Sequence, residues 1–170
     1  KLTSLGEPKF LAGRTPPVKP RPYARFTGAS APAAMVTFGR ENPTRASSET
    51  SGHSGRLAND GNPATFWQAD AGDTNAWLSV DLERVVSVSQ VQLTFRAEAA
   101  WRYRIEISTD GSSDWRMVSD QIKAAGRAKA MTLRAENGAR GRFLRVQFVG
   151  SDAMPAALAE IEVQGHLETQ

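Results

Sequence analysis

The chain of 170 residues contains no cysteine, so no disulfide can hold its fold together. It has only two histidines, and no nucleophile-elbow motif accompanies them. No run of about 18 apolar residues occurs, so no membrane-spanning helix is predicted. The lack of cysteine does not exclude secretion, because it removes only one sign of an oxidising compartment. Since the sequence begins at Lys1 rather than Met, we expect it to be a piece of a longer protein.

Catalytic groups are also scarce. A hydrolase needs paired carboxylates, a nucleophile with its base, or a metal cluster. Glu160 and Glu162 alternate along one expected strand, so their side chains point to opposite faces and cannot act on one bond. A Ser-His-Asp arrangement would have to use His53, because His166 follows Gly165 in an expected C-terminal tail. We therefore expect no catalysis within this chain.

The net charge of +3 is unevenly distributed. Residues 1–45 carry a balance of +6, whereas residues 46–170 carry −3. Nucleic-acid binding requires a basic face on the folded domain itself, so no nucleic-acid partner is expected. Five prolines between positions 14 and 32 favour extended backbone. Residues 1–32 are therefore predicted to be an extension and interdomain linker, with an ordered strap as the alternative for residues 23–26.

From residue 33 onward, apolar and polar residues alternate with period two, which predicts half-buried strands. A bulge is expected near residues 89–90, and turns at residues 110–112 and 137–138. At most one helical turn is expected, within residues 121–128. About eight short strands predict an all-β sandwich or barrel, followed by a tail at residues 166–170. The expected strands are residues 35–38, 44–48, 77–82, 86–95, 103–107, 115–118, 130–133, 143–148 and 161–163.

Residues 56–67 concentrate oxygen donors in a sharp turn. Asp60-Gly61 indicates the turn, because Gly adopts backbone angles that side chains forbid. The turn brings the Asp60 carboxylate, the Thr65 hydroxyl and backbone carbonyls toward one point. Calcium prefers six to eight such oxygens at about 2.3–2.6 Å. The alternative is a turn that only links two strands.

Together these segments resemble the discoidin, or coagulation factor five/eight type C, family, and most of all its bacterial carbohydrate-binding modules of family 32. The resemblance covers about residues 33–165 and implies an eight-stranded jelly-roll β-sandwich of the galactose-binding-domain type. The absence of cysteine favours the bacterial branch, since the animal domains usually join their ends by a disulfide. The segments that carry the resemblance are residues 47–53, 56–67, 76–82, 103–111, 142–146 and 158–163.

The resemblance implies a structural calcium ion, held by the turn loop and by a glutamate on the last strand. Glu160 follows the loop by about a hundred residues, so the ion would join the two ends of the fold. The alternative is a hydrogen-bonded turn in which Glu160 pairs with an arginine. Carried over, the side-chain donors are Asp60, Thr65 and Glu160, and the backbone donors are Leu57, Asn62, Thr65 and Ala159.

The resemblance also implies a sugar site on loops at one end of the sandwich, where an aromatic face and a few polar groups contact a pyranose. It places His53 and Arg96 at ligand-contacting positions. Galactose-binding members carry an asparagine shortly after this arginine, but Ala100, Trp101 and Arg102 occupy that region here. Trp101 is predicted to be a stacking platform. For Trp101, as for each of the other residues of this site, the alternative is a solvated loop residue. Further hydrogen bonds are expected from the polar loop of Gln68, Asp70, Asp73 and Asn75.

These expectations describe a non-catalytic carbohydrate-binding module of a secreted bacterial glycoside hydrolase, extracellular or periplasmic. It would tether the enzyme to a glycan, with galactose-containing glycans included, and we expect it to be a monomer. One alternative is a structural accessory domain that packs on a catalytic domain without binding sugar. Another is adhesion to lipid or to a cell surface, for which only Trp101 and Met154 offer exposed apolar contacts.

Overall fold

The computed structural model describes residues 35–123, 126–149 and 154–167. All of them belong to one unit of the chain, Pro32–Gln170. The linker expected in residues 1–32 lies outside the described residues. The elements are β1 (Val36–Phe38), β2 (Thr44–Ala46), the 3₁₀ turn η1 (Gly55–Ala58), β3 (Trp67–Gln68), β4 (Trp77–Ala99), β5 (Tyr103–Ser108), β6 (Arg116–Asp120), β7 (Ala128–Phe148) and β8 (Ala157–Leu167).

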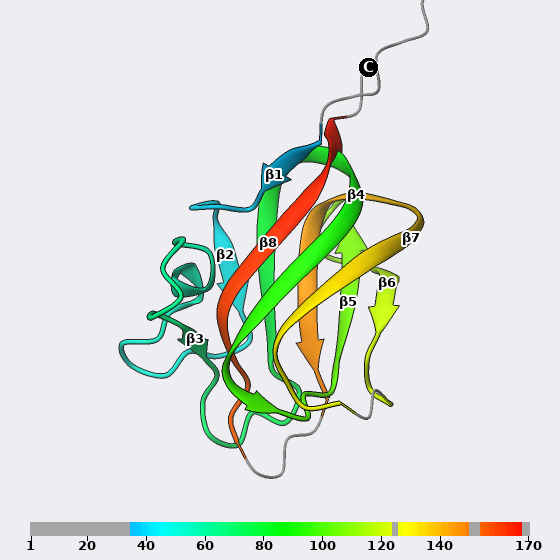
Figure 1. Ribbon diagram of the computed structural model, residues 1–170. Coiled ribbons are helices and arrows are strands. Elements are labelled where there is room, and N and C mark those ends of the chain that lie inside the picture. The colour runs from blue at the N-terminus through cyan, green and yellow to red at the C-terminus, as the bar shows by residue number, and fades with distance from the viewer. Residues whose placement is uncertain (1–34, 124–125, 150–153, 168–170) are drawn as a thin grey trace, which may run out of the picture. The chain divides into compact units, whose positions relative to one another are not determined.

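The strands pair antiparallel in the order β1-β8-β4-β7-β5-β6, with β2 added to β4 and β3 added to β8. Two layers result, because β4 and β7 each run through both of them. The second part of β4 pairs with β8 and with the first part of β7, whereas its first part pairs with β2 and with the end of β7. Figure 1 shows β8 and the diagonal parts of β4 and β7 in front, with β2, β5 and β6 behind. The predicted all-β sandwich is confirmed.

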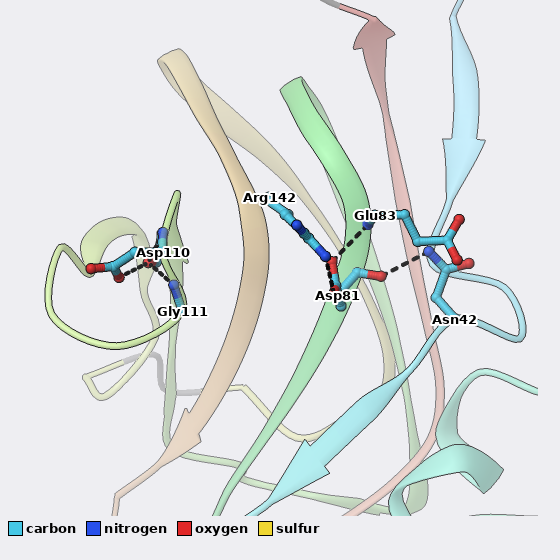
Figure 2. Close-up of polar contacts among 7 residues, drawn as sticks. Asn42, Asp81, Glu83, Asp110, Gly111 and Arg142 are labelled. Carbon is cyan, nitrogen blue, oxygen red and sulfur yellow. Dashed lines mark hydrogen bonds and ion pairs between the residues drawn. The ribbon is translucent and has the colours of Figure 1, made fainter.

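The two long strands change layers at irregular points in their pairing. On β4 the register breaks between Asp81 and Val86, and Glu83 adopts a positive φ of 63° there. Asp81 fixes this bend, because one carboxylate oxygen accepts the Glu83 N–H at 2.7 Å (Figure 2). The same carboxylate is clamped by the Arg142 guanidinium on β7, and the Asp81 carbonyl accepts a hydrogen bond from Asn42. The bend of one strand is thus tied to its neighbour.

Alternation along the strands sends their apolar side chains between the layers. On β5, Tyr103, Ile105 and Ile107 are buried, whereas the intervening charged residues point outward. Burying one such side chain contributes about 1.5–3 kcal/mol. The core extends from Trp67 on β3 to Phe95 on β4, both fully buried. Packing of this core fixes the strands, and with them the points at which the loops begin at each end of the sandwich.

Several expected boundaries differ from the structure. The segments predicted as separate strands at residues 77–82 and 86–95 are one strand, β4, and those at 130–133 and 143–148 are one strand, β7. The turn predicted at residues 137–138 lies within β7, where residues 135–138 fall outside the pairing with β4. The bulge expected near residues 89–90 is confirmed by register shifts toward both β7 and β8. Alternation predicts strands locally, but only the partner strands decide whether a strand continues past a bulge.

The last strand extends further than expected. β8 runs from Ala157 to Leu167, so its end includes two residues that were predicted to begin the C-terminal tail. In the segment where one helical turn was expected, Ile122 and Lys123 form a turn and Ala128 begins β7, while residues 124–125 lie outside the described part. Among the described residues, no helix is long and apolar enough to cross a membrane.

Candidate functional site

The turn loop after η1 is held together by hydrogen bonds among its own oxygens. Asp60 Oδ1 accepts the Asn62 N–H at 2.9 Å, and the Thr65 hydroxyl donates to Asp60 Oδ2 at 2.8 Å. The same hydroxyl lies 2.8 Å from the Asn62 carbonyl oxygen. Gly61 has φ +78°, and the Arg40 guanidinium covers it so closely that a Cβ would clash. The oxygens of Asp60, Asn62 and Thr65 therefore converge, as the spacing predicted.

Glu160 on β8 lies against this loop. The residue is 8% exposed, and its Oε1 has no hydrogen-bond partner within the described structure. Burial, and then the negative charge of Asp60 beside it, raises the pKa of Glu160 to about 7. The pairing of β8 with β4 skips Ala159, so a bulge precedes Glu160. No ion pair joins Glu160 to an arginine in the described part of the chain, which counts against the alternative of a Glu–Arg pair.

These groups fit a hard cation. Two neighbouring carboxylates and a hydroxyl offer only oxygen, which Ca²⁺ prefers. A buried carboxylate oxygen without a partner is costly, and a cation would satisfy it. Among the described residues, no three or more His, Cys, Asp or Glu side chains lie together so that they could hold a metal ion, so such a cation would also need backbone carbonyls. The expected carbonyl donors lie on elements that meet here, since Leu57 belongs to η1, Ala159 belongs to β8, and η1 contacts β8.

A second cluster joins His53, Phe66, Gln68 and Arg96, and we call it the His53 cluster. The His53 and Phe66 rings stack with centroids 4.0 Å apart. The Arg96 guanidinium carbon lies 4.5 Å from the Phe66 ring centroid, and Nη1 donates to Gln68 Oε1 at 2.6 Å. Nδ1 of His53 is 3.2 Å from the Phe66 carbonyl oxygen. Three of the predicted sugar-contacting residues are thus brought together around one aromatic ring.

Phe66 was not among the predicted site residues. It directly precedes Trp67, which begins β3 and is fully buried. Because successive side chains of extended backbone point to opposite sides, a buried Trp67 leaves Phe66 half-buried at the surface. This alternation could have predicted from the sequence that Phe66 lies at the surface. It could not have predicted that His53 and Arg96, which come from other segments, contact its ring.

Asp73 and Asn75 lie in a polar loop that bonds mainly to itself and to the preceding segment. Asp73 accepts hydrogen bonds from the Ser47 and Ser48 hydroxyls, both at 2.6 Å, and from the Asn75 N–H at 3.2 Å. Burial acts to raise the pKa of Asp73, but these hydrogen bonds together hold it below its ordinary value. Within the described residues, no hydrogen bond links either residue to the His53 cluster. The structure therefore does not unite them with the other predicted sugar contacts.

Trp101 lies in the core, and the prediction that it forms an exposed platform is wrong. It is 6% exposed and stacks on Phe95 with ring centroids 5.2 Å apart. Its indole N–H donates to the Ala97 carbonyl at 3.0 Å, and Phe148 packs edge-on against it. The loop position suggested exposure, but aromatic residues from neighbouring strands cover the ring. Of the two apolar contacts considered for lipid adhesion, only Met154, 37% exposed, lies at the surface.

The sequence model of the F5/8 type C domain matches residues 43–161. The chain belongs to this family. The match includes both the turn loop and Glu160, so the two parts of the oxygen cluster lie within the F5/8 type C domain. The resemblance to the discoidin family is thereby confirmed. Among curated protein sequences, none is similar enough to count as a match.

Solved structures with this F5/8 type C fold include sugar-binding modules. Chitosan-binding module 2 of a Paenibacillus sp. IK-5 chitosanase/glucanase, in complex with chitotriose, is 29% identical with TM-score 0.64, covering 74% of this chain and 97% of the module. The family 32 module of Clostridium perfringens NanJ, in complex with galactose, is 20% identical with TM-score 0.64, covering 77% and 99%. The C. perfringens module CpGH89CBM32-4, with GlcNAc-α-1,4-galactose, is 22% identical with TM-score 0.65, covering 79% and 97%.

Proposed function

We propose that this domain is a non-catalytic carbohydrate-binding module and that the His53 cluster is its sugar-contacting surface. The observation that carries the proposal is the placement of Arg96, whose side chain is exposed yet held by Gln68 over the Phe66 ring. A guanidinium held in one position offers several hydrogen-bond donors in a fixed geometry. Because Gln68 orders the side chain before a ligand arrives, less entropy is lost on binding.

The remaining groups supply what a pyranose requires. Sugar rings present hydroxyls at their edges and patches of C–H on their faces, so a site combines polar groups with an apolar surface. His53 and Arg96 provide the polar groups, and the half-buried Phe66 provides apolar surface between them. A single shallow site of this kind should bind weakly, with a dissociation constant of about 0.1–1 mM.

The similar solved structures support two parts of the proposal, namely that the ligand is a sugar and that the module belongs to a glycoside hydrolase. They include modules bound to chitotriose, to galactose and to GlcNAc-α-1,4-galactose. A linked binding module raises the effective concentration of its enzyme at the glycan. We infer that this domain does so, as a monomeric accessory module, for a bacterial glycoside hydrolase outside the cytoplasm.

A structural calcium ion is the second part of the proposal. Asp60, Thr65 and Glu160 would hold it through side-chain oxygens, and carbonyls of Leu57, Asn62, Thr65 and Ala159 would complete the shell. The unpartnered Oε1 of Glu160 beside Asp60 supports this assignment. The bound ion would supply positive charge between two carboxylates that otherwise repel each other, and it would connect the turn loop to β8.

Isothermal titration of the domain with galactose and with chitotriose, in the presence of calcium, tests the sugar site. Arg96→Ala should weaken binding by about tenfold or abolish it, because it removes charge-assisted hydrogen bonds. Arg45→Ala, which changes an exposed arginine on β2, is the matched control and should bind like the wild type. A folded Arg96→Ala variant with undiminished binding would refute the assignment of the site. Failure of the wild type to bind any glycan on an array would refute the function.

A further inference from the structure

A groove of about 590 Å³ lies on the side of the sandwich, between β6 and the irregular part of β7. Arg116, Met117 and Ser119 line it from β6, and Arg134, Gly138 and Arg140 line it from β7; we call it the arginine groove. None of these residues belongs to the His53 cluster or to the expected calcium ligands. Its volume lies within the range of about 300–1,000 Å³ that is typical of ligand sites.

The groove lies beside the bulge of β7. Between Arg134 and Ala139 the strand leaves its pairing with β4, so residues 135–138 fall outside that ladder. Bulges redirect the side chains beside them, and they often occur next to binding sites. The opposite wall is formed by β6, which pairs only with β5 in the described structure. The Arg116 guanidinium donates to the Arg140 carbonyl at 2.6 Å and thereby connects the two walls.

Positive charge is concentrated in the arginine groove. Among the described residues that line it are three arginines and one carboxylate, Asp120, which already pairs with Arg104 at 3.3 Å. Arg134 is exposed and has no hydrogen bond or ion pair with any described residue. Arg116 uses one of its five N–H donors on the Arg140 carbonyl, which leaves the others available. Residues 46–170 carry a net charge of −3, so the groove is positively charged although the domain around it has a net negative charge.

Guanidinium groups select for oxyanions. Their planar fork of donors matches the spacing of the oxygens in a carboxylate or a sulfate, which a lone ammonium does not match. The Ser119 hydroxyl and the exposed Met117 side chain, 56% exposed, add a polar and an apolar contact of the kind that sugar rings use. A peptide added to β6 as an extra strand is less suitable, because the Arg116–Arg140 hydrogen bond crosses from the start of β6 to β7.

We propose that the arginine groove is a second ligand site, which binds glycans carrying carboxylate or sulfate groups. Arg134 and Arg116 contact the anionic substituents, while the sugar ring lies along Met117 and Ser119. This site is separate from the His53 cluster, so the two can bind different parts of one polysaccharide or different glycans. Its existence does not depend on the proposed function of the His53 cluster.

Isothermal titration at low ionic strength tests the second site with two anionic probes, oligogalacturonate for carboxylate and sulfated dextran oligosaccharide for sulfate. Neutral dextran is the control ligand. Wild-type protein should bind at least one anionic probe and not the neutral one, and the preferred probe identifies the substituent. Arg134→Gln should weaken binding by about fivefold to tenfold, as expected for one half-solvated charged contact. Its thermal midpoint should stay nearly unchanged, because the exposed Arg134 side chain forms no ion pair with any described residue.

Two further variants distinguish binding at the arginine groove from a general effect of net charge and from binding at the His53 cluster. Arg45→Gln removes the same charge from β2, at the other edge of the layer that contains β6, and should bind the anionic probe within about twofold of wild type. Arg96→Ala should retain anionic-probe binding even though it loses the sugar ligand. The proposal is overturned if neither anionic probe binds, or if Arg45→Gln and Arg134→Gln weaken binding equally. Binding of polyglutamate with the same affinity and arginine dependence would overturn the assignment to glycans.

Discussion

Arg142 donates a hydrogen bond to each carboxylate oxygen of Asp81, from Nε at 2.7 Å and from Nη2 at 2.8 Å. The two residues lie on β7 and β4, where both strands pass from one layer of the sandwich to the other. The side chain of Asp81 is 19% exposed and that of Arg142 is 43% exposed, so the pair is only partly shielded from water. Its importance comes from position, because it joins two bends that the rest of the topology depends on (Figure 2).

Asp81→Asn should lower the free energy of unfolding at neutral pH by about 1 kcal/mol, a value near the upper limit for partly exposed pairs. The hydrogen bonds from Arg142 are the main reason that the pKa of Asp81 lies below its ordinary value of 3.8. A lowered carboxyl pKa stabilises the fold above the unfolded pKa, and this contribution is lost as the pH falls through the folded value. Urea unfolding at several pH values should therefore show a difference that shrinks in acid.

Asp120→Asn is the matched control for that measurement. Asp120 also pairs with an arginine, Arg104 on β5, but the two side chains are 40% and 41% exposed and Asp120 ends the edge strand β6. It should change stability less than Asp81→Asn does. Equal effects of the two substitutions would show that the Asp81–Arg142 pair has no special role at the strand bends.

Calcium should stabilise the domain more at about pH 7.5 than at about pH 5. Burial and the charge of Asp60 raise the pKa of Glu160 to about 7 from its ordinary 4.5. Without metal, the Glu160 carboxyl of the folded state stays protonated between pH 4.5 and about 7, whereas that of the unfolded state does not. The free energy of unfolding therefore falls as the pH rises across this range. Bound calcium would take the place of this proton, and calcium at 100 times its dissociation constant should add about 2.7 kcal/mol to the free energy of unfolding. Thermal unfolding in EDTA and in calcium measures both effects.

Glu160→Gln should remove the calcium response while leaving the protein in EDTA at neutral pH at least as stable as wild type, since the repulsion from Asp60 disappears. Glu162→Gln, at an exposed position two residues along β8, should keep the full response. An unaltered calcium-dependent rise in the midpoint of Glu160→Gln would exclude Glu160 as a ligand.

Trp101 should behave as a core residue in every measurement. Trp101→Ala should reduce the free energy of unfolding by about 3–5 kcal/mol, because it leaves a cavity beside Phe95. Trp101→Phe keeps an aromatic ring in the core and should bind sugar as the wild type does. If Trp101→Phe folds with normal stability but loses glycan binding in titration, the indole contacts the ligand after all.

The sequence predicted the local parts of the site better than its assembly. Asp60, Asn62 and Thr65 fall within one tight turn, so their spacing alone places their oxygens close together. The exposure of aromatic rings depends instead on residues that are distant in sequence. Phe66 lies at the surface and Trp101 in the core, and neither assignment follows from the loop in which the residue occurs.

By itself, the sequence determined that the chain folds as strands, because period-two alternation fixes which side chains share a face of any sheet they join. It also determined the turn with its oxygen donors, since Gly at Asp60-Gly61 permits the backbone angles required. Only the tertiary structure decided that β4 and β7 cross both layers, and it placed Glu160 beside Asp60, which the family resemblance implied but the residues alone did not. Strand register and layer packing set those relationships, and they depend on pairing between segments far apart in the chain.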